Sequence, residues 1–221
     1  MKVILQCSGS KKPTLKGNGF RANDGRLIKF VADPKGAPVS DEYYFARPDD
    51  LADARHTWRE KLLAYNKSET SNPLGLLPAY KLYDNKVYED MARKFGVDRF
   101  YILSAGWGLI AADFLLPDYD ITFSKAKDVP PYCRRHKLDR YDDYCHLYDD
   151  DDTVYFIGGK DYLPFFRKLT ADYKGDKVVY YNSCMRPNAE DGLYFERFIT
   201  SQRTNWQYAC AQALIDGKVK I

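Results

Sequence analysis

The first residues of the chain that suggest chemistry are 6–13, QCSGSKKP, which follow the apolar segment KVIL and introduce small side chains and two cations. Small residues let a ligand approach the backbone, and successive N–H groups beside Lys11 and Lys12 favour an anion such as a phosphate. The simpler interpretation of such a run is a tight turn between a strand and a helix. The candidate binding residues of this loop are Cys7, Ser8, Gly9, Ser10, Lys11 and Lys12.

Three further small and polar segments follow other apolar runs. They are SAGWG at 104–108, GGKD at 158–161 and NSC at 182–184. One such loop favours a turn, but four at one rim favour a pocket, because ligands of open parallel sheets bind outside the carboxyl ends of the strands. The further candidate binding residues are Ser104, Ala105, Gly106, Trp107, Gly108, Gly158, Gly159, Lys160, Asn182 and Ser183.

The segments that precede these loops have the composition of buried strands. They are nearly continuous in apolar character instead of alternating, which is typical of a parallel sheet covered on both faces. We therefore predict a central parallel sheet with Gln6, Leu103, Ile157 and Tyr181 near the carboxyl ends of neighbouring strands. The predicted strands are 2–6 (KVILQ), 99–103 (RFYIL), 153–157 (TVYFI) and 177–181 (KVVYY).

Helical spacing lies between these strands. Residues 85–95 carry one apolar stripe, and Gly96 follows where a helix tends to end. An earlier helix is predicted over roughly residues 50–65, with Asp49 or Asp50 as its cap. Apolar residues at helical spacing also recur near the end of the chain, in Tyr162, Phe165, Phe166 and Leu169 and in Trp206, Cys210, Ala213 and Leu214.

The alternation of strands and helices predicts an α/β fold, a three-layer α/β/α sandwich around a mainly parallel four-stranded sheet. The length of 221 residues favours one domain over residues 1–221. Two segments do not fit the alternation and are predicted to be insertions. Residues 17–45 look irregular or hairpin-like, and residues 124–152 are rich in Pro, Tyr and Asp.

The charge balance permits nucleic acid without demanding it. Lys and Arg number 34 against 31 Asp and Glu, so the net charge is +3. The five cysteines form no CxxC pair, and neither a signal peptide nor a long apolar run is visible. We expect reduced thiols, a cytoplasmic location and no membrane partner.

A metal site built from Cys133, His136, Cys145 and His146 is the alternative for the cysteines. Adjacent residues such as Cys145 and His146 point their side chains apart in a strand or helix, so no metal is expected. The acidic run at 149–152 is interpreted as a solvated loop. The chain also lacks GxxxxGK[ST], GxGxxG and GxSxG, and its three histidines fall outside the four loops, so no nucleotide cofactor and no Ser-His-Asp triad is expected.

Carboxylates follow the second loop, at Asp113, Asp118 and Asp120. A carboxylate beside a pocket with an aromatic ring can serve N-glycosidic chemistry: Trp107 would stack on a base and Asn182 would read its edge. The carboxylate would stabilise a cationic sugar or activate water. Asp113 and Asp120 are the candidate catalytic residues, with a surface position as the alternative for Asp113.

Four segments together carry a resemblance to a known family. CSGSKKP (7–13), PAYKLY (78–83), YILSAGWGLI (101–110) and PDYD (117–120) resemble the YaaA-like family of uncharacterised bacterial proteins, related to the uracil-DNA-glycosylase-like domain of archaeosine synthase. The resemblance implies a glycosylase-like sandwich. The positions that match the family are Cys7, Lys11, Lys12, Ser104, Ala105, Gly108, Leu109, Tyr119 and Asp120, and the resemblance makes Tyr119 a further candidate substrate-binding residue.

Some positions depart from that family. Trp107 stands where relatives often have a small or basic residue, and Asp118 separates Pro117 from Tyr119. Uracil-DNA glycosylases carry a water-activating Asp in the first loop and a His after the last strand, and this chain has neither. The resemblance therefore points to a substrate other than uracil, such as a bulky modified base in phage defence or a base exchanged during hypermodification.

Three hypotheses remain open. The first is a DNA glycosylase that acts on a modified base, with DNA favoured over RNA. The second is a non-catalytic DNA-binding protein that uses Arg134, Arg135 and Lys137 on a Tyr-rich insertion. The third is an enzyme of free nucleosides or nucleotides. Polyanion binding weakens steeply with salt, which separates the second hypothesis from the third.

Overall fold

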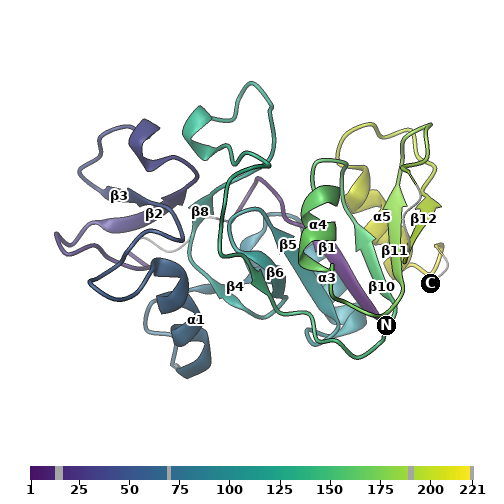
Figure 1. Ribbon diagram of the computed structural model, residues 1–221, viewed down its shortest axis with the longest axis horizontal. Helices are drawn as coiled ribbons and strands as arrows, with labels where there is room; N and C mark the ends of the chain where they lie inside the picture. Colours follow the sequence, from purple (N-terminus) through teal and green to yellow (C-terminus); the bar gives the residue numbers. More distant parts are fainter. Residues whose placement is uncertain (13–16, 69–70, 189–191, 220–221) are drawn as a thin grey trace.

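The computed structural model describes residues 1–12, 17–68, 71–188 and 192–219, and its centre is a mainly parallel sheet of seven strands (Figure 1). Five neighbouring strands are parallel, whereas β6 runs antiparallel to β5 and parallel to β9. In spatial order the strands are β12 (Leu193–Arg197), β11 (Lys177–Tyr181), β10 (Val154–Ile157), β1 (Lys2–Gln6), β5 (Phe100–Ser104), β6 (Gly108–Ala111) and β9 (Tyr144–Cys145).

The four predicted strands are confirmed as the parallel centre of this sheet. Gln6 lies opposite Leu103, Leu5 opposite Ile157, and Ile157 opposite Tyr180, so the four strand ends share one edge. The predicted number of strands, four, was too low, because the sheet has seven. β9 has two residues and β12 is mostly exposed, so neither shows the continuous apolar run that marks a buried strand. β6 does show such a run, but it follows β5 after a tight reversal and was predicted as part of the loop.

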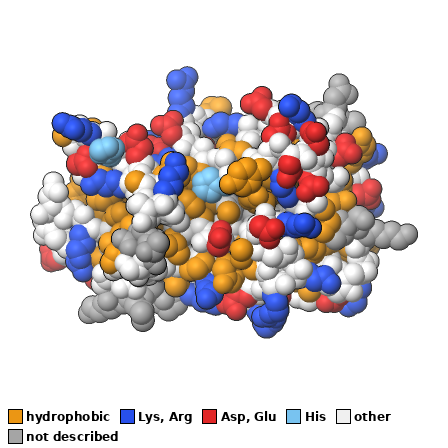
Figure 2. Space-filling model, turned by 90° about the horizontal axis from the view of Figure 1, so that it is seen from below, with side chains coloured by type: hydrophobic (Ala, Val, Ile, Leu, Met, Phe, Trp, Pro, Cys, Tyr) orange, Lys and Arg blue, Asp and Glu red, His pale blue; other side chains and the backbone are white. Residues whose placement is uncertain are grey.

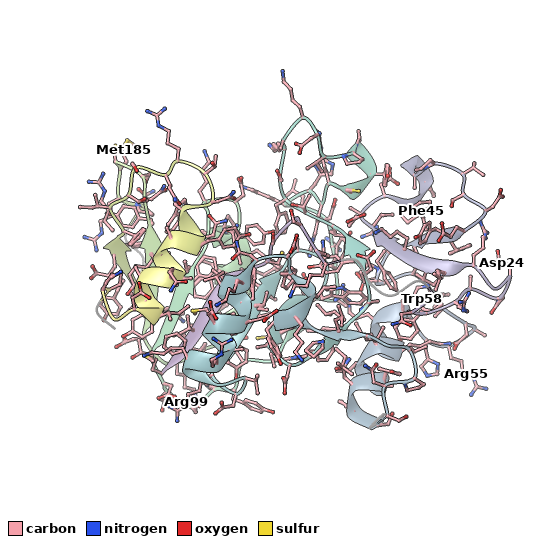
Figure 3. All side chains as sticks on the ribbon, turned by 180° about the vertical axis from the view of Figure 1, so that it is seen from behind. Asp24, Phe45, Arg55, Trp58, Arg99 and Met185 are labelled. Atoms are coloured by element: carbon pink, nitrogen blue, oxygen red, sulfur yellow. The ribbon has the colours of Figure 1, made fainter. Side chains whose placement is uncertain are left out.

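Helices flank both faces of the sheet. α3 (Lys86–Phe95) and α5 (Trp206–Ile215) pack on each other on one face, and α4 (Leu163–Leu169) covers the other (Figures 1 and 3). All three were predicted from their apolar spacing. Asn85 caps α3 by accepting a hydrogen bond from the Val87 N–H, and Gly96 ends that helix at φ 83°.

The early helix begins later than predicted. α1 spans Trp58–Ser68, and its first turn is closed by a reciprocal pair in which each of Thr57 and Glu60 accepts a hydrogen bond from the other's backbone N–H. The prediction that Asp49 or Asp50 caps this helix is therefore wrong. Asp49 instead pairs with the buried Arg59, and Asp50 accepts from the Arg47 N–H.

The first predicted insertion contributes to a second sheet, neither irregular nor a hairpin. β2 (Leu27–Val31) lies between β3 (Tyr43–Ala46) and β8 (Tyr119–Asp120), and all three strands are parallel. In Figure 1 this sheet lies to the left of the central one, above α1. The remaining short elements are β4 (Leu77–Pro78) paired with β7 (Leu115–Leu116), α2 (Ala79–Leu82), and the 3₁₀ turns η1 (Pro34–Gly36) and η2 (Pro131–Cys133).

The buried side chains of both sheets form one cluster. Phe30 of the second sheet packs edge-on against Trp107 at 5.1 Å and against Trp58 of α1 at 6.1 Å. Residues 124–152 are not only a surface insertion, because β9 lies at the edge of the central sheet and Tyr144 stacks on Trp107. Within the described ranges, no helix has the length and apolar character needed to cross a membrane.

Candidate functional site

A cleft of about 1100 Å³ lies at the carboxyl ends of the parallel strands. In Figure 3 Met185, in the loop after β11, marks this upper edge, and Arg99, just before β5, marks the opposite one. Three of the four predicted strand-end loops line the cleft, which confirms that they share one rim. The predicted residues that line it are Cys7, Ser8, Gly9, Ser10, Lys11, Asp120, Gly158, Gly159, Lys160, Asn182 and Ser183.

The beginnings of three helices also face this cleft. Asn85 at the start of α3, Leu163 at the start of α4 and Trp206 at the start of α5 are among the residues that line it. Because the first N–H groups of a helix lack partners within the helix, this end carries a partial positive charge. Together with Lys11 and Lys160, the beginnings of the two longer helices, α3 and α5, favour an anionic ligand.

Asp120 lies in the wall that the second sheet contributes to the cleft. Lys29 of β2 pairs with Asp118 at 2.8 Å and with Asp120 at 3.0 Å. Burial alone would lower the pKa of Lys29, but the two carboxylates outweigh it and raise that pKa. Asp120 keeps 44% of its side chain exposed, so its carboxylate is anchored by a cation and still open to the cleft.

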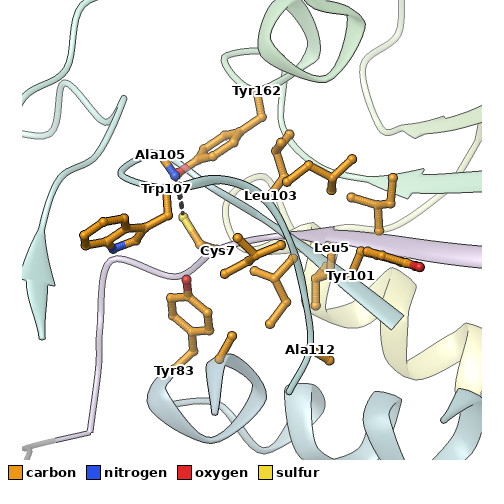
Figure 4. Close-up of a cluster of buried hydrophobic side chains, with 14 of the residues drawn as sticks. Leu5, Cys7, Tyr83, Tyr101, Leu103, Ala105, Trp107, Ala112 and Tyr162 are labelled. Carbon is orange, nitrogen blue, oxygen red and sulfur yellow. Dashed lines mark hydrogen bonds between the residues drawn. The ribbon is translucent and has the colours of Figure 1, made fainter. Parts of the chain in front are cut away.

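A buried polar network lies behind this wall, and Figure 4 shows its Cys7 end, with the hydrogen bond between Ala105 and Cys7 as a dashed line. The hydroxyl of Tyr119 lies 2.8 Å from the hydroxyls of both Ser104 and Tyr83. The thiol of Cys7 accepts a hydrogen bond from the Ala105 N–H at 3.4 Å and lies 3.2 Å from the hydroxyl of Tyr162. The segments that carry the family resemblance therefore meet here, although they are far apart in the sequence.

Tyr119 supports the site without lining the cleft. Its ring is buried, and burial raises the pKa of its hydroxyl well above the ordinary value, so it acts as a neutral hydrogen-bonding group. Since Asp120 follows Tyr119 in β8, fixing the ring also fixes where the carboxylate points. Its assignment as a substrate-binding residue is corrected to a positioning role.

Lys11 packs against the same network from the side of the cleft. Its Nζ lies 4.2 Å from the centre of the Tyr119 ring and 3.5 Å from the carbonyl oxygen of Gly9. Burial lowers the pKa of Lys11, while the nearby Cys7 and Asp120 act in the opposite direction. Lys12 points elsewhere and pairs with Glu89 of α3 at 2.5 Å, so it does not line the cleft.

The second predicted loop does not reach the cleft. Ser104, Ala105, Gly106, Trp107 and Gly108 are buried, and the indole of Trp107, which packs against Phe30 and Tyr144, cannot stack on a bound base. Two buried arginines hold the carbonyls of this loop: Arg59 donates to those of Gly106 and Trp107, each at 3.0 Å, and Arg135 donates to that of Ala105 at 2.7 Å.

Asp113 is also misplaced by the sequence prediction. β5 and β6 form an antiparallel pair, so the chain after β6 returns to the amino ends of the parallel strands, where the Ala112 N–H donates to the Phe100 carbonyl. Asp113 is exposed at that opposite edge and does not line the cleft. Of the two candidate catalytic carboxylates, the structure brings only Asp120 to the cleft.

The three basic residues of the DNA-binding hypothesis all have partners within the protein. Arg135 is buried and forms two hydrogen bonds with Asp143, at 2.7 and 2.8 Å. Arg134 donates to the backbone carbonyls of Val129 and Ala126, and Lys137 pairs with Asp161 at 3.3 Å. These three side chains serve mainly to order the 124–152 segment.

The third and fourth loops lie where they were predicted. Gly158 leaves room for Phe156, whose ring would lie 2.3 Å from an added Cβ, and the Gly159 N–H donates to the side-chain oxygen of Gln6 at 2.6 Å. Asn182 donates from its amide to the Gln202 carbonyl at 3.3 Å. Lys160 is exposed at the mouth of the cleft.

Several cleft residues were not foreseen. The half-buried rings of Tyr132 and Tyr181 line the cleft. Lys29, which anchors Asp120, comes from residues 17–45, the segment that was predicted to be an insertion. The high tyrosine content of the sequence was the sign that such rings could line a pocket. Nothing local marks Lys29, because its role depends on β2 pairing with the distant β8.

The cysteines are free thiols, and Cys7, Cys133 and Cys210 are buried. Burial raises the pKa of Cys133 to about 11. In the described part of the chain, no three His, Cys, Asp or Glu side chains are grouped as metal ligands. The acidic run forms ion pairs at the opposite edge, where Asp150 pairs with the buried Lys2 and Asp152 with the amino terminus.

Comparison with known proteins gives no relative for this chain: no family model, no curated protein and no solved structure matches it.

Proposed function

We propose that this protein is a nucleobase-handling enzyme, a DNA glycosylase that cleaves the N-glycosidic bond of a modified base. The observation that carries the proposal is the meeting of Asp120 and Lys11 in one cleft, at the edge where the helix beginnings favour a phosphate backbone. The resemblance of the segments around Cys7, Ser104 and Asp120 supports the same class of reaction. A role in defence against phages with modified DNA fits such a substrate.

The chemistry assigns each side of the cleft a role. As the N-glycosidic bond breaks, the sugar becomes cationic, and the carboxylate of Asp120 stabilises that charge or takes a proton from the attacking water. Lys29 keeps this carboxylate in place at 3.0 Å. With Trp107 buried, the half-buried rings that line the cleft and can stack on a displaced base include those of Tyr132, Tyr181 and Tyr208.

The test compares two aspartates that both follow β6. Asp120→Asn removes a charge from the cleft without removing volume, and we expect base release to fall by about 100-fold or more while DNA binding stays nearly unchanged. Asp113→Asn makes the same chemical change at the opposite edge and is expected to leave base release at the wild-type rate. Free base is measured on DNA with cytosine-, thymine- or guanine-derived modifications, beside unmodified DNA.

Three outcomes count against this proposal. Equal base release by the wild type and Asp120→Asn would remove the carboxylate from its role. Binding of such DNA by the wild type with no base release from any of it would favour the non-catalytic DNA-binding protein. Activity on free nucleosides that is insensitive to salt would favour the third hypothesis.

A further inference from the structure

Lys11 differs from the other lysines near the cleft in being half-buried without a carboxylate partner among the described residues, whereas Lys125 and Lys160, which also line the cleft, are exposed. Lys12, Lys29 and Lys137 each pair with a carboxylate at 3.3 Å or less. Within the described residues Lys11 forms no such pair, and its Nζ instead lies over the face of Tyr119. A half-buried amine that lines a cleft without a bound carboxylate is available to a substrate.

The surroundings of Lys11 also favour its neutral form. Burial lowers the pKa of this amine, against the opposing effect of Cys7 and Asp120, so a larger fraction is unprotonated than for a solvated lysine. A neutral lysine amine is a nucleophile toward carbonyl carbons, whereas an arginine at the same position is not. Asp120, in the same cleft, is a base that can take a proton from the substrate.

We propose that this protein has a second activity, the cleavage of DNA at an abasic sugar, in which the Lys11 amine forms an imine with C1′ and Asp120 takes the proton from C2′. This inference rests on the proposed function, because a glycosylase leaves an abasic sugar in its own cleft. The substrate class is DNA that carries the ring-opened aldehyde of that sugar.

The steps balance without any further reactant. The lone pair of Nζ attacks the C1′ aldehyde, and loss of one water with uptake of one proton gives the protonated imine. Asp120 removes a proton from C2′, the C–H electrons form the C2′–C3′ double bond, and the C3′–O bond breaks, so that the downstream strand leaves with the phosphate at its 5′ end. Water then hydrolyses the imine and restores the amine of Lys11.

A duplex with one preformed abasic site tests this activity without knowledge of the modified base. Borohydride reduces the imine to a stable amine, which links protein and DNA. Lys11→Arg keeps the positive charge and removes the nucleophile, so we expect at least about tenfold less linked product and strand cleavage. Its affinity for the abasic duplex should change by less than about threefold, since a charge remains for the phosphate.

Lys127→Arg is the matched control, because Lys127 is an exposed lysine beside the cleft that does not line it. It should give as much linked product as the wild type. The inference is overturned if the wild type gives no linked product, if Lys11→Arg retains it, or if peptide mapping places the link on another amine. Base release from modified DNA is measured separately, so loss of the lyase activity alone leaves the proposed function standing.

Discussion

Two loops rich in small residues follow the neighbouring strands β1 and β5 and lie in different environments. Residues 7–11 line the cleft, and an added Cβ on Gly9 would meet nothing within 4 Å. Residues 104–108 are buried, and an added Cβ on Gly108 would lie 2.3 Å from the Tyr144 carbonyl oxygen. Small residues therefore serve ligand access in one loop and close backbone packing in the other.

The partners of the buried loop explain this difference. Its carbonyls accept hydrogen bonds from Arg59 and Arg135, and β9 covers Gly108. The loop after β1 is held mainly at its two ends, where the Cys7 N–H donates to the Leu103 carbonyl and the Lys12 N–H to that of Leu82. Between them the Ser10 N–H donates to Ser8 Oγ at 3.1 Å, and among the described residues the Ser8 and Gly9 N–H groups have no hydrogen-bond partner. A loop whose backbone polar groups are hydrogen-bonded within the protein supports the site. A loop with unbonded backbone N–H groups can instead use them to bind a ligand.

The largest expected effect concerns the ion pair behind the buried loop. Asp143→Asn leaves Arg135, which has 3% of its side chain exposed, without its charged partner, and should destabilise the fold by about 4 kcal/mol. Urea unfolding followed by tyrosine and tryptophan fluorescence measures the change. Asp142→Asn, at the exposed neighbouring position, is the control and should change stability by less than about 0.5 kcal/mol. Equal stability of the two variants would show that the loop does not depend on this pair.

The second prediction compares the two glycines directly. Gly108 has φ 102° and its Cα faces the backbone of β9, so Gly108→Ala should cost about 3 kcal/mol through strain and displacement of Tyr144. Gly9→Ala has open space and should leave the free energy of unfolding within about 0.5 kcal/mol. Thermal unfolding of both variants checks the contrast. A similar loss at Gly9 would mean that the first loop is as tightly packed as the second.

Much of the central fold was predictable because its signal is local. Each of the four parallel strands is a continuous apolar run, and α3 shows its stripe, its cap and its terminal glycine within a few residues. The second sheet was not predictable in this way. β2 and β8 are distant in sequence, and Tyr119–Asp120 is too short to show a strand pattern.

The site was predictable only where a side chain's position follows from the end of its own strand. Lys11 and Gly159 are of this kind. Asp113 and Trp107 are not, because the reversal from β5 into β6 carries one to the opposite edge and buries the other. Figure 2 shows the edge opposite the cleft, where acidic and basic side chains lie intermixed. A carboxylate in the sequence thus identifies a catalytic candidate only after the chain direction is known.

The smallest expected effect concerns pH and the aromatic stack that supports the buried loop. His146 stacks on Tyr144, which stacks on Trp107, and its Nδ1 accepts a hydrogen bond from the Ala111 N–H at 3.4 Å. Burial lowers the pKa of His146 from 6.5 to about 4. In the unfolded chain the imidazole binds a proton near pH 6.5, whereas the folded protein binds it only near pH 4. Between these values protons favour the unfolded state, so stability is complete above pH 6.5 and falls as the pH drops toward 4.

The loss attributable to His146 should reach about 2 kcal/mol by pH 4, less than the full shift implies because the ring keeps some contact with water. His146→Gln retains a hydrogen-bond acceptor but does not titrate, so its free energy of unfolding should fall less steeply than that of the wild type over this range. Urea unfolding at pH 8, 6, 5 and 4 measures both proteins. Parallel curves would show that His146 is solvated in the native state, and that the stack behind the buried loop is looser than the packing of Gly108 against β9 indicates.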